Sequence, residues 1–174
     1  AAAVKGLGLP AVKRYEMVQF LEQLLLSDSQ QATAGKRQAA LFTYEALFRY
    51  FGYPFEPYVV LIAPHIVNAF DDNQSHVRSA AERAGSTLLS NLSAVAVSKL
   101  LPRIIESVEG RSARLKCGGT MCLGFLTQCT KRALSISLPR IVPTLAQLVN
   151  DANPQVQKLA AAGLENIAQA IPNP

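Results

Sequence analysis

The stretch LLPRIIESVEG at residues 100–110 recurs along the chain in two further, diverged copies. The other copies are IAPHIV at 62–67, continued by FDD at 70–72, and IVPTLA at 141–146, continued by VND at 149–151. Aligned on Pro64, Pro102 and Pro143, the three copies agree through the next 24 positions, at spacings of 38 and 41 residues. The chain therefore contains an internal repeat, and the repeat unit is the first guide to its fold.

Each repeat has the pattern of two helices. Leu101, Ile104, Ile105 and Val108 have helical spacing, and the chain has no sustained strand-like alternation. In the second half of each copy, small residues occupy matched positions, where they would let neighbouring helices approach closely; these are Ala81, Gly119 and Ala160. A period of about 40 residues with two helices per unit is typical of HEAT and armadillo-type proteins. We predict an all-α HEAT-repeat α-solenoid of about four helix pairs, at 10–52, 55–91, 94–130 and 133–171.

Local signals suggest where the helices begin and end. In the first pair, Pro10 should open a helix that runs to about Ser27, followed by a polar turn or flexible loop at 27–35 and a helix that ends near Phe51. Residues 1–8 resemble the tail of an earlier helix. The later helices are predicted at 55–71, 75–91, 94–109, 113–129, 133–150 and 154–171. Their N-caps are predicted at Ser75, at Ser112 and at the Asn153-Pro154 pair.

The repeated prolines conflict with simple helix rules. A proline in mid-helix removes a hydrogen bond and costs about 3 kcal/mol, yet Pro64, Pro102 and Pro143 recur at one position of the repeat. We favour a kink that bends each first helix around its partner. The alternative is that each helix starts at its proline, which would leave apolar loops at 58–63 and 97–101.

Composition limits the classes of protein to which the chain can belong. Of its 174 residues 49% are hydrophobic, enough for a substantial core, and no apolar run approaches 18 residues. The N-terminus lacks the layout of a signal peptide. Cys117, Cys122 and Cys129 form an odd set within one predicted helix and its end, which favours reduced thiols in a cytosolic or nuclear protein over a disulfide framework. The formal net charge of +5 permits a polyanionic partner without establishing one.

No catalytic constellation is visible. Gly118-Gly119 lies inside a helical pattern, and neither phosphate-binding glycine motif occurs. His65 and His76, the two histidines, have no cysteine or carboxylate at metal-ligand spacing, so we expect them to be exposed or partly packed. Cys117 and Cys122 lack the second ligand pair of a zinc site, which favours buried packing. We predict a non-enzymatic protein with no catalytic, cofactor-binding or metal-binding residues.

An acid in the turn between the helices of one unit, with a base six residues later, suggests a charged ladder. Asp72 would face Arg78, and also Arg37 or Lys116 from adjacent units; Asp151 occupies the matching turn downstream. Such pairs could fix the rise from unit to unit. Simple surface charge is the alternative.

Basic residues are the remaining candidates for function. They gather around two turns and comprise Arg103, Arg111, Arg114, Lys116, Lys131 and Arg132. In a solenoid, Arg111, Arg114 and Lys116 would share one edge, and Lys131 and Arg132 the other. Cations on such edges can contact phosphates in a salt-sensitive, sequence-independent way. A solvated edge without a ligand is the other interpretation, and base stacking is not supported because aromatic residues are scarce nearby.

Several segments together resemble a known family. They are KRQAALFTYE at 36–45, FEPYVV at 55–60, SNLSA at 90–94, KCGG at 116–119 and LPRIVP at 138–143. In order and spacing they resemble the central, elongation-factor-three-like region of the HEAT-repeat translational activators of general amino acid control ("general control non-derepressible one"). The family usually has a tryptophan before the Arg-x-Lys that matches residues 114–116, where this chain has Ala113.

The resemblance implies a fragment of a larger, cytoplasmic, non-enzymatic scaffold on translating ribosomes. Such a scaffold promotes activation of the kinase that phosphorylates initiation factor two alpha in the integrated stress response. Its expected partners are the ribosome, an ABC-type ATPase and, through other regions of the full protein, that kinase. Two alternatives remain: a protein-only HEAT adaptor of the transport-receptor or phosphatase-scaffold type, and the HEAT domain of elongation factor three itself.

Overall fold

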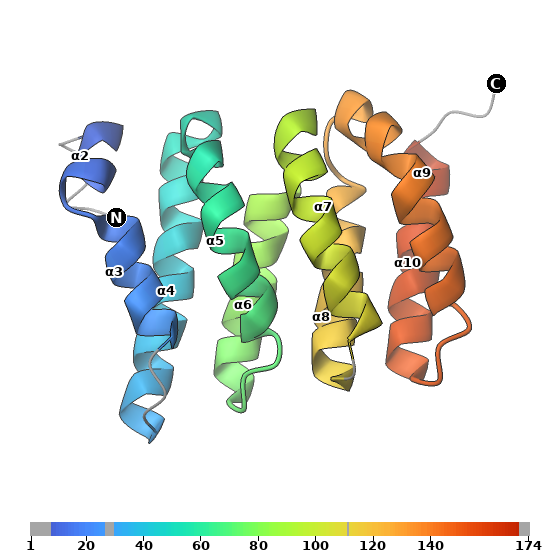
Figure 1. The fold of residues 1–174 in the computed structure, drawn as a ribbon, viewed down its shortest axis with the longest axis horizontal. Coiled ribbons are helices and arrows are strands. Elements are labelled where there is room, and N and C mark those ends of the chain that lie inside the picture. Colours follow the sequence, from blue (N-terminus) through green and yellow to red (C-terminus); the bar gives the residue numbers. More distant parts are fainter. Residues whose placement is uncertain (1–7, 27–29, 111, 171–174) are drawn as a thin grey trace. The chain divides into compact units, whose positions relative to one another are not determined.

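A computed structural model describes residues 8–26, 30–110 and 112–170 of the chain. All regular secondary structure within these ranges is helical, which confirms the predicted all-α fold (Figure 1). In chain order they are α2 (Leu9–Arg14), α3 (Met17–Leu26), α4 (Gln30–Phe51), the 3-10 turn η1 (Tyr53–Phe55), α5 (Glu56–Ala69), α6 (Ser75–Leu89), α7 (Ala94–Glu109), α8 (Ala113–Leu126), α9 (Lys131–Leu148) and α10 (Pro154–Ala170).

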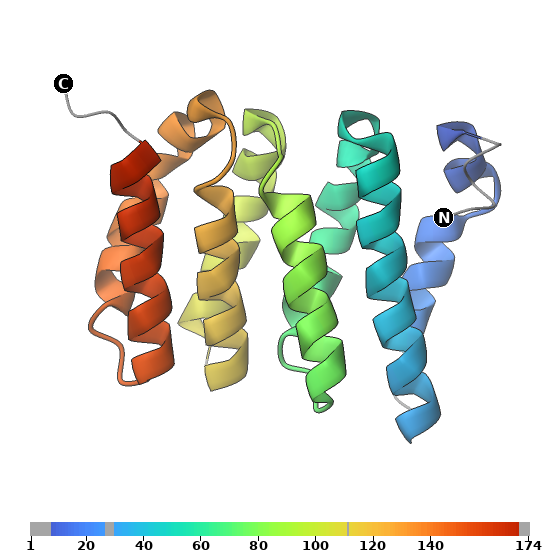
Figure 2. The ribbon, with the colours of Figure 1, turned by 180° about the vertical axis from the view of Figure 1, so that it is seen from behind.

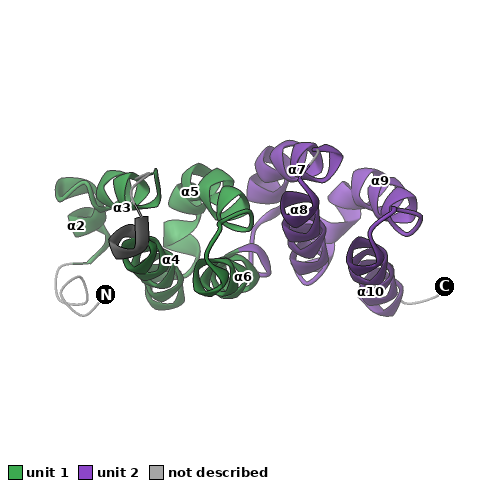
Figure 3. Cartoon of the chain, turned by 90° about the horizontal axis from the view of Figure 1, so that it is seen from below, with its two compact units in different colours: residues 1–88 green, residues 89–174 purple. Residues whose placement is uncertain are grey.

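The chain divides into two compact units, residues 1–88 and 89–174 (Figure 3). Each unit has two layers of helices. In the first unit α3 and α5 form one layer and α4 and α6 the other; in the second, α7 and α9 lie in front of α8 and α10 (Figures 1 and 2). The first helix of every predicted pair therefore contributes to one layer of its unit and the second helix to the other.

Each unit has its own buried core. In the first unit Tyr44, Phe55 and Ile62 are fully buried, and the Tyr44 hydroxyl donates to the Val18 carbonyl oxygen at 3.2 Å. In the second unit Ile104 and Leu123 belong to the fully buried set. Of the stripe that helical spacing indicated, Leu101, Ile104 and Val108 are buried, and their burial stabilises the packing of α7.

The repeated prolines lie inside helices. Pro64 is in α5, Pro102 in α7, and α9 contains both Pro139 and Pro143. The alternative that each helix begins at its proline is therefore wrong. The helices continue because residues on both sides of each proline are buried, and packing stabilises most protein helices more than propensity does. The kink stays a prediction.

The first helix pair differs from its prediction. The helix expected from Pro10 to Ser27 is interrupted, because α2 ends at Arg14 and α3 begins at Met17. Between them Glu16 has a φ of 47°, a left-handed conformation that ends a helix. The loop expected at 27–35 is also wrong from Gln30 onward, where α4 has begun. The expectation for residues 1–8 lies outside the described residues, apart from Gly8.

Two of the three predicted N-caps are confirmed. The Ser112 hydroxyl accepts from the Leu115 backbone N–H at 3.3 Å, and the Asn153 side chain accepts from Gln155 at 2.9 Å, just before Pro154 opens α10. The cap predicted at Ser75 is wrong, because Ser75 is already the first residue of α6.

The glycine in the middle of α8 allows close helix packing. A Cβ on Gly119 would overlap the Ser107 hydroxyl oxygen and come within 2.8 Å of Val108 Cγ1, both on α7. Gly163 of α10 is similarly close to Leu145 of α9, where the gap would be 3.0 Å. Gly119 and Gly163 thus let the two layers of the second unit approach each other. Among the described helices, none is long and apolar enough to cross a bilayer.

Candidate functional site

In the first unit, an aspartate fastens the turn between α5 and α6 to α4. Asp72 accepts two bonds from Arg37, at 2.6 Å from Nε and 3.1 Å from Nη2, and a third at 2.9 Å from the Gln74 backbone N–H. Arg78 does not meet this carboxylate as expected. Its Nη1 donates to the carbonyl oxygens of Asp72 and Asn73, at 2.8 and 3.1 Å, and so closes the turn through its main chain.

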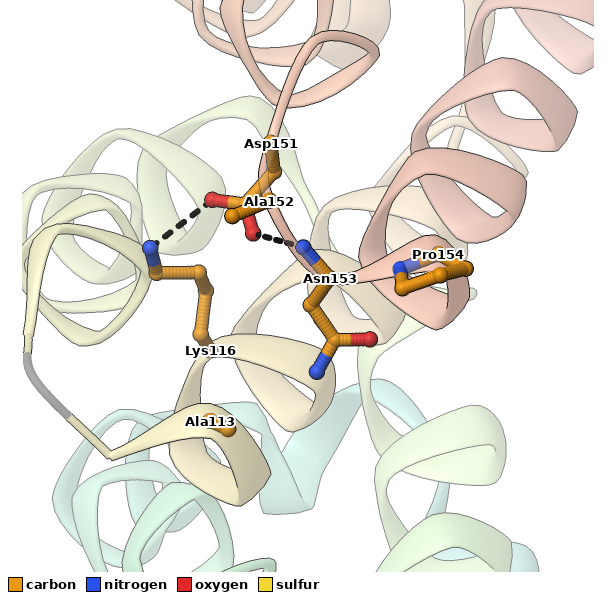
Figure 4. A pocket seen from close by; sticks show the side chains of 6 residues that line it. All are labelled: Ala113, Lys116, Asp151, Ala152, Asn153 and Pro154. Atoms are coloured by element: carbon orange, nitrogen blue, oxygen red, sulfur yellow. Dashed lines mark hydrogen bonds and ion pairs between the residues drawn. The ribbon is translucent and has the colours of Figure 1, made fainter.

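The second unit repeats this arrangement in the turn between α9 and α10. Lys116 Nζ lies 2.8 Å from Asp151 Oδ2, while the other carboxylate oxygen accepts from the Asn153 backbone N–H at 2.9 Å (Figure 4). Gln157 Nε2 donates to the Asp151 carbonyl oxygen at 2.6 Å, as Arg78 does in the first unit. The structure thus pairs Asp72 with Arg37, and Lys116 with Asp151. Whether these pairs set the rise of the solenoid stays a prediction.

Hydrogen bonds and ion pairs lower the pKa of both aspartates. Burial alone would raise the pKa of Asp72, but the bonds from Arg37 and Gln74 outweigh it, and the pKa lies below its ordinary value. The Lys116 bond, helped by the Asn153 N–H, likewise lowers the pKa of Asp151. Both groups are therefore charged acceptors at neutral pH.

The predicted basic residues divide into two groups. Lys116 is half-buried, with 26% of its side chain exposed, and its ammonium group is occupied by Asp151. Arg103 is exposed on α7 and pairs with Glu106 one turn later, at 3.1 Å. Arg114, Lys131 and Arg132 are exposed in the first turns of α8 and α9. Arg111 lies outside the described residues. Lys116 therefore has a structural partner, whereas the other described members of the predicted set, Arg103, Arg114, Lys131 and Arg132, are exposed.

The cations in the first turns of α8 and α9 lie where they do not help their helices. The N-terminal end of a helix carries partial positive charge, so a cation there is unfavourable, by roughly 0.3–1 kcal/mol on exposed helices. The first turns of α8 and α9, whose residues are all described, contain no acid that would offset this. Helix stability thus does not explain Arg114, Lys131 and Arg132.

A hollow of about 490 Å³ adjoins the Lys116–Asp151 pair. Its lining comprises Ala113, Lys116, Asp151, Ala152, Asn153 and Pro154 (Figure 4). Ala113 stands where the sequence resemblance led us to expect a tryptophan. The small side chain of Ala113 leaves this space open.

In the part of the chain that the structure describes, the thiols and histidines join no group of three side chains that could hold a metal ion. The three cysteines are free and buried, and the described residues include no cluster of three metal-ligating side chains. His65 is partly packed, as expected, but the fold brings a carboxylate to it. Its Nε2 lies 3.5 Å from Glu22 Oε1, a contact between α5 and α3 that sequence spacing did not reveal.

A second charged cluster, also not predicted, lies between α4 and α6. Glu45 is buried, with 5% of its side chain exposed, and accepts from Arg49 at 2.8 Å and from Arg83 at 3.3 Å. Arg83 also stacks over the Phe42 ring, 4.9 Å from its centroid. The spacing of Glu45 and Arg49 by four residues in a helix was the one available signal; nothing local connects either to Arg83.

Comparison with known proteins places the chain in a family. Residues 1–164 match a family model described as "EF3 N-terminal HEAT repeat". The chain belongs to this family. Across all 174 residues it is 37% identical to the "Stalled ribosome sensor GCN1" of Homo sapiens and to the "eIF-2-alpha kinase activator GCN1" of Dictyostelium discoideum, and it spans 6% of the length of each. The predicted resemblance is confirmed.

The more distant matches agree with this assignment. "Elongation factor 3B" of Saccharomyces cerevisiae is 24% identical over 119 residues, which are 68% of this chain and 11% of that protein. Among solved structures, a designed armadillo repeat protein in complex with the peptide (KR)4 aligns with a TM-score of 0.51 at 17% identity, over 84% of this chain and 62% of that one. An engineered protein gives a TM-score of 0.51 at 18% identity, over 87% and 62%. These structural matches support the α-solenoid fold alone.

Proposed function

We propose that this chain is a non-catalytic segment of a cytoplasmic, ribosome-associated scaffold that promotes activation of the initiation-factor-two-alpha kinase during amino acid starvation. The observation that carries the proposal is the 37% identity over the whole chain to proteins named stalled ribosome sensor and eIF-2-alpha kinase activator. Elongation factor three is the weaker candidate, because its identity is lower and covers less of the chain.

The exposed cations of the second unit are the candidate contacts with the ribosome. Arg114, Lys131 and Arg132 are accessible and do not stabilise the helices in which they lie, which is expected of residues kept for a ligand. Ribosomal RNA would offer them phosphate groups. Arg103 and Arg111 belong to the same proposed set. Lys116 is better explained by its pair with Asp151.

The remaining partners follow from the same proposal. An ABC-type ATPase of the pathway would bind the scaffold on the ribosome, and the stress kinase would bind other regions of the full protein. This segment would then contribute ribosome contact and no direct kinase contact.

Cosedimentation of the full chain with ribosomes over a salt series tests the proposal. We expect binding to weaken as salt rises, because each phosphate contact releases counterions. The variant R114E/K131E/R132E should bind more weakly and with a shallower salt dependence. R140E/K158E, which reverses two exposed charges at positions outside the proposed set, is the control.

Two outcomes would count against it. If R114E/K131E/R132E cosediments as well as the parent chain, these residues do not contact the ribosome. If the parent chain does not cosediment at any salt concentration, the chain is not a ribosome-binding segment.

A further inference from the structure

The cluster of Glu45, Arg49, Arg83 and Phe42, here called the arginine face, is not explained by the proposed function. It lies within the first unit, on α4 and α6, which run side by side in Figure 2. Both guanidinium groups contact the same carboxylate oxygen, Glu45 Oε1, at 2.8 Å from Arg49 and 3.4 Å from Arg83. One buried acid therefore holds two arginines from different helices close together.

Both arginines are exposed enough to bind a second anion in addition to Glu45. A buried carboxylate needs a partner to offset its lost hydration, and one arginine with good geometry can supply it. Here two do so, while 65% of the Arg49 side chain and 62% of the Arg83 side chain remain exposed. After Glu45 is neutralised, one positive charge remains at the surface, with guanidinium N–H groups still open to solvent.

The surroundings increase this excess of positive charge. Along their full described length, α4 and α6 have five basic residues and two acidic ones; the bases are Lys36, Arg37, Arg49, Arg78 and Arg83, and the acids are Glu45 and Glu82. Of the bases, Arg37 is committed to Asp72. An anionic partner would thus be attracted to these helices and could then bond to two guanidinium groups already in position.

The aromatic residues indicate which kind of anion fits. Nucleic acid bases bind best on an open aromatic face, but Arg83 already covers one face of the Phe42 ring. Phe42 is 37% exposed to solvent. Tyr50, the residue after Arg49, is about half-exposed. Arginine with partly exposed phenylalanine and tyrosine is the composition typical of protein–protein contacts.

We propose that the arginine face binds an acidic segment of a partner protein, with an aspartate or glutamate carboxylate bridging Arg49 and Arg83 and an adjacent apolar side chain packing near Phe42. Glu45 acts through the arginines as a positioning residue. The proposal goes beyond ribosome association and does not depend on it, because it uses residues of the other unit.

Fluorescence anisotropy with the full chain tests the proposal directly. The probe is a labelled peptide, Glu-Glu-Leu-Glu-Phe-Glu-Glu, compared with its counterpart in which glutamine replaces every glutamate. We expect the acidic peptide alone to bind, and R49Q/R83Q to weaken its binding at least about tenfold, because the bridging carboxylate loses both guanidinium groups. R140Q/K158Q removes the same number of charges elsewhere and should change affinity less than about twofold.

Variants of Glu45 separate a positioned pair from simple charge attraction. E45Q makes the chain more positive, so general attraction would tighten binding of the acidic peptide. The positioned pair requires the opposite, a weaker complex, because the guanidinium groups lose their anchor. E45D keeps the charge but withdraws the carboxylate by one methylene, and should also weaken binding. If R49Q/R83Q fails to fold because Glu45 is left buried and unpaired, E45Q/R49Q/R83Q, which has no such charge, takes its place in the peptide assay.

Three results would overturn the proposal. They are unchanged peptide affinity in both R49Q/R83Q and E45Q/R49Q/R83Q, binding that is not weakened in either E45Q or E45D, and a uridine oligonucleotide that loses more affinity than the peptide does in R49Q/R83Q. The last would make the arginine face a nucleic-acid site.

Discussion

Gly119 and Gly124 lie on the same helix and differ in what surrounds them. Gly119 faces α7, where Ser107 and Val108 fill the space that a side chain would need. Around Gly124, no atom apart from its chain neighbours and the nearby backbone of its own helix lies within 4 Å of the position of a Cβ. The pair therefore separates a glycine needed for packing from one that only weakens its helix.

At Gly119, substitution by alanine should destabilise the chain by about 1–3 kcal/mol, as overpacking of a core usually does. Gly124→Ala, the matched control, should instead stabilise it by about 0.5–1 kcal/mol, because glycine is a poor helix former. Urea unfolding of both variants measures the two effects. Equal changes for both would show that α7 and α8 can move apart at no cost.

Among the elements, the turns that hold Asp72 and Asp151 should make stability depend on pH. A carboxyl whose pKa is lower in the folded chain stabilises the fold at pH values above its unfolded value, 3.8. That contribution fades as the pH falls through the folded-state pKa. We therefore expect the free energy of unfolding to drop between about pH 5 and pH 3 more steeply in the parent chain than in D72N/D151N.

Urea unfolding at pH 7, 5, 4 and 3 measures this difference. E106Q, which removes an exposed ion pair with Arg103, should lower stability by less than about 1 kcal/mol and keep the pH dependence of the parent. If D72N/D151N follows the parent curve at every pH, the two turns do not stabilise the fold through their charges.

Signals for the ends of helices were readable from sequence where they are local. Ser112 and Asn153 bond to a backbone N–H two or three residues away, so their neighbours suffice to predict them. The prediction at Ser75 is wrong because the backbone N–H groups of Val77 and Arg78 donate to the Gln74 carbonyl oxygen, so the helix starts one residue earlier. The break at Glu16 could not be foreseen, since no glycine, asparagine or proline marks it.

On the scale of the whole molecule, the repeat made some distant contacts predictable and left others hidden. The Arg37–Asp72 and Lys116–Asp151 pairs are both 35 residues apart, so the period of the sequence brings such residues into register. Glu45 and Arg83 are 38 residues apart but have no counterpart in the other copies that would have pointed to them. The candidate ribosome contacts came from charge and family resemblance, and their role remains a proposal.

The reactivity of the three cysteines measures how well the core of the second unit is shielded from solvent. Burial raises the pKa of the Cys122 thiol to about 12, and burial is also the main reason that the pKa of Cys117 is raised. The third thiol, of Cys129, donates to the Leu89 carbonyl oxygen at 2.9 Å. We expect Ellman's reagent to react slowly with the native chain and with all three thiols in denaturant. Rapid, complete reaction of the native chain would contradict this packing.

The turn at Asp72 also has a consequence for the order in which the polypeptide can become structured as it is synthesised. Its carboxylate binds Arg37, and the carboxylate of Asp151 binds Lys116, so in both cases the cation has been translated before the acid. Each turn is therefore synthesised after the helix that carries its charged partner, α4 for Asp72 and α8 for Asp151. Assembly from the N-terminal end, one repeat at a time, needs no later segment to close either turn.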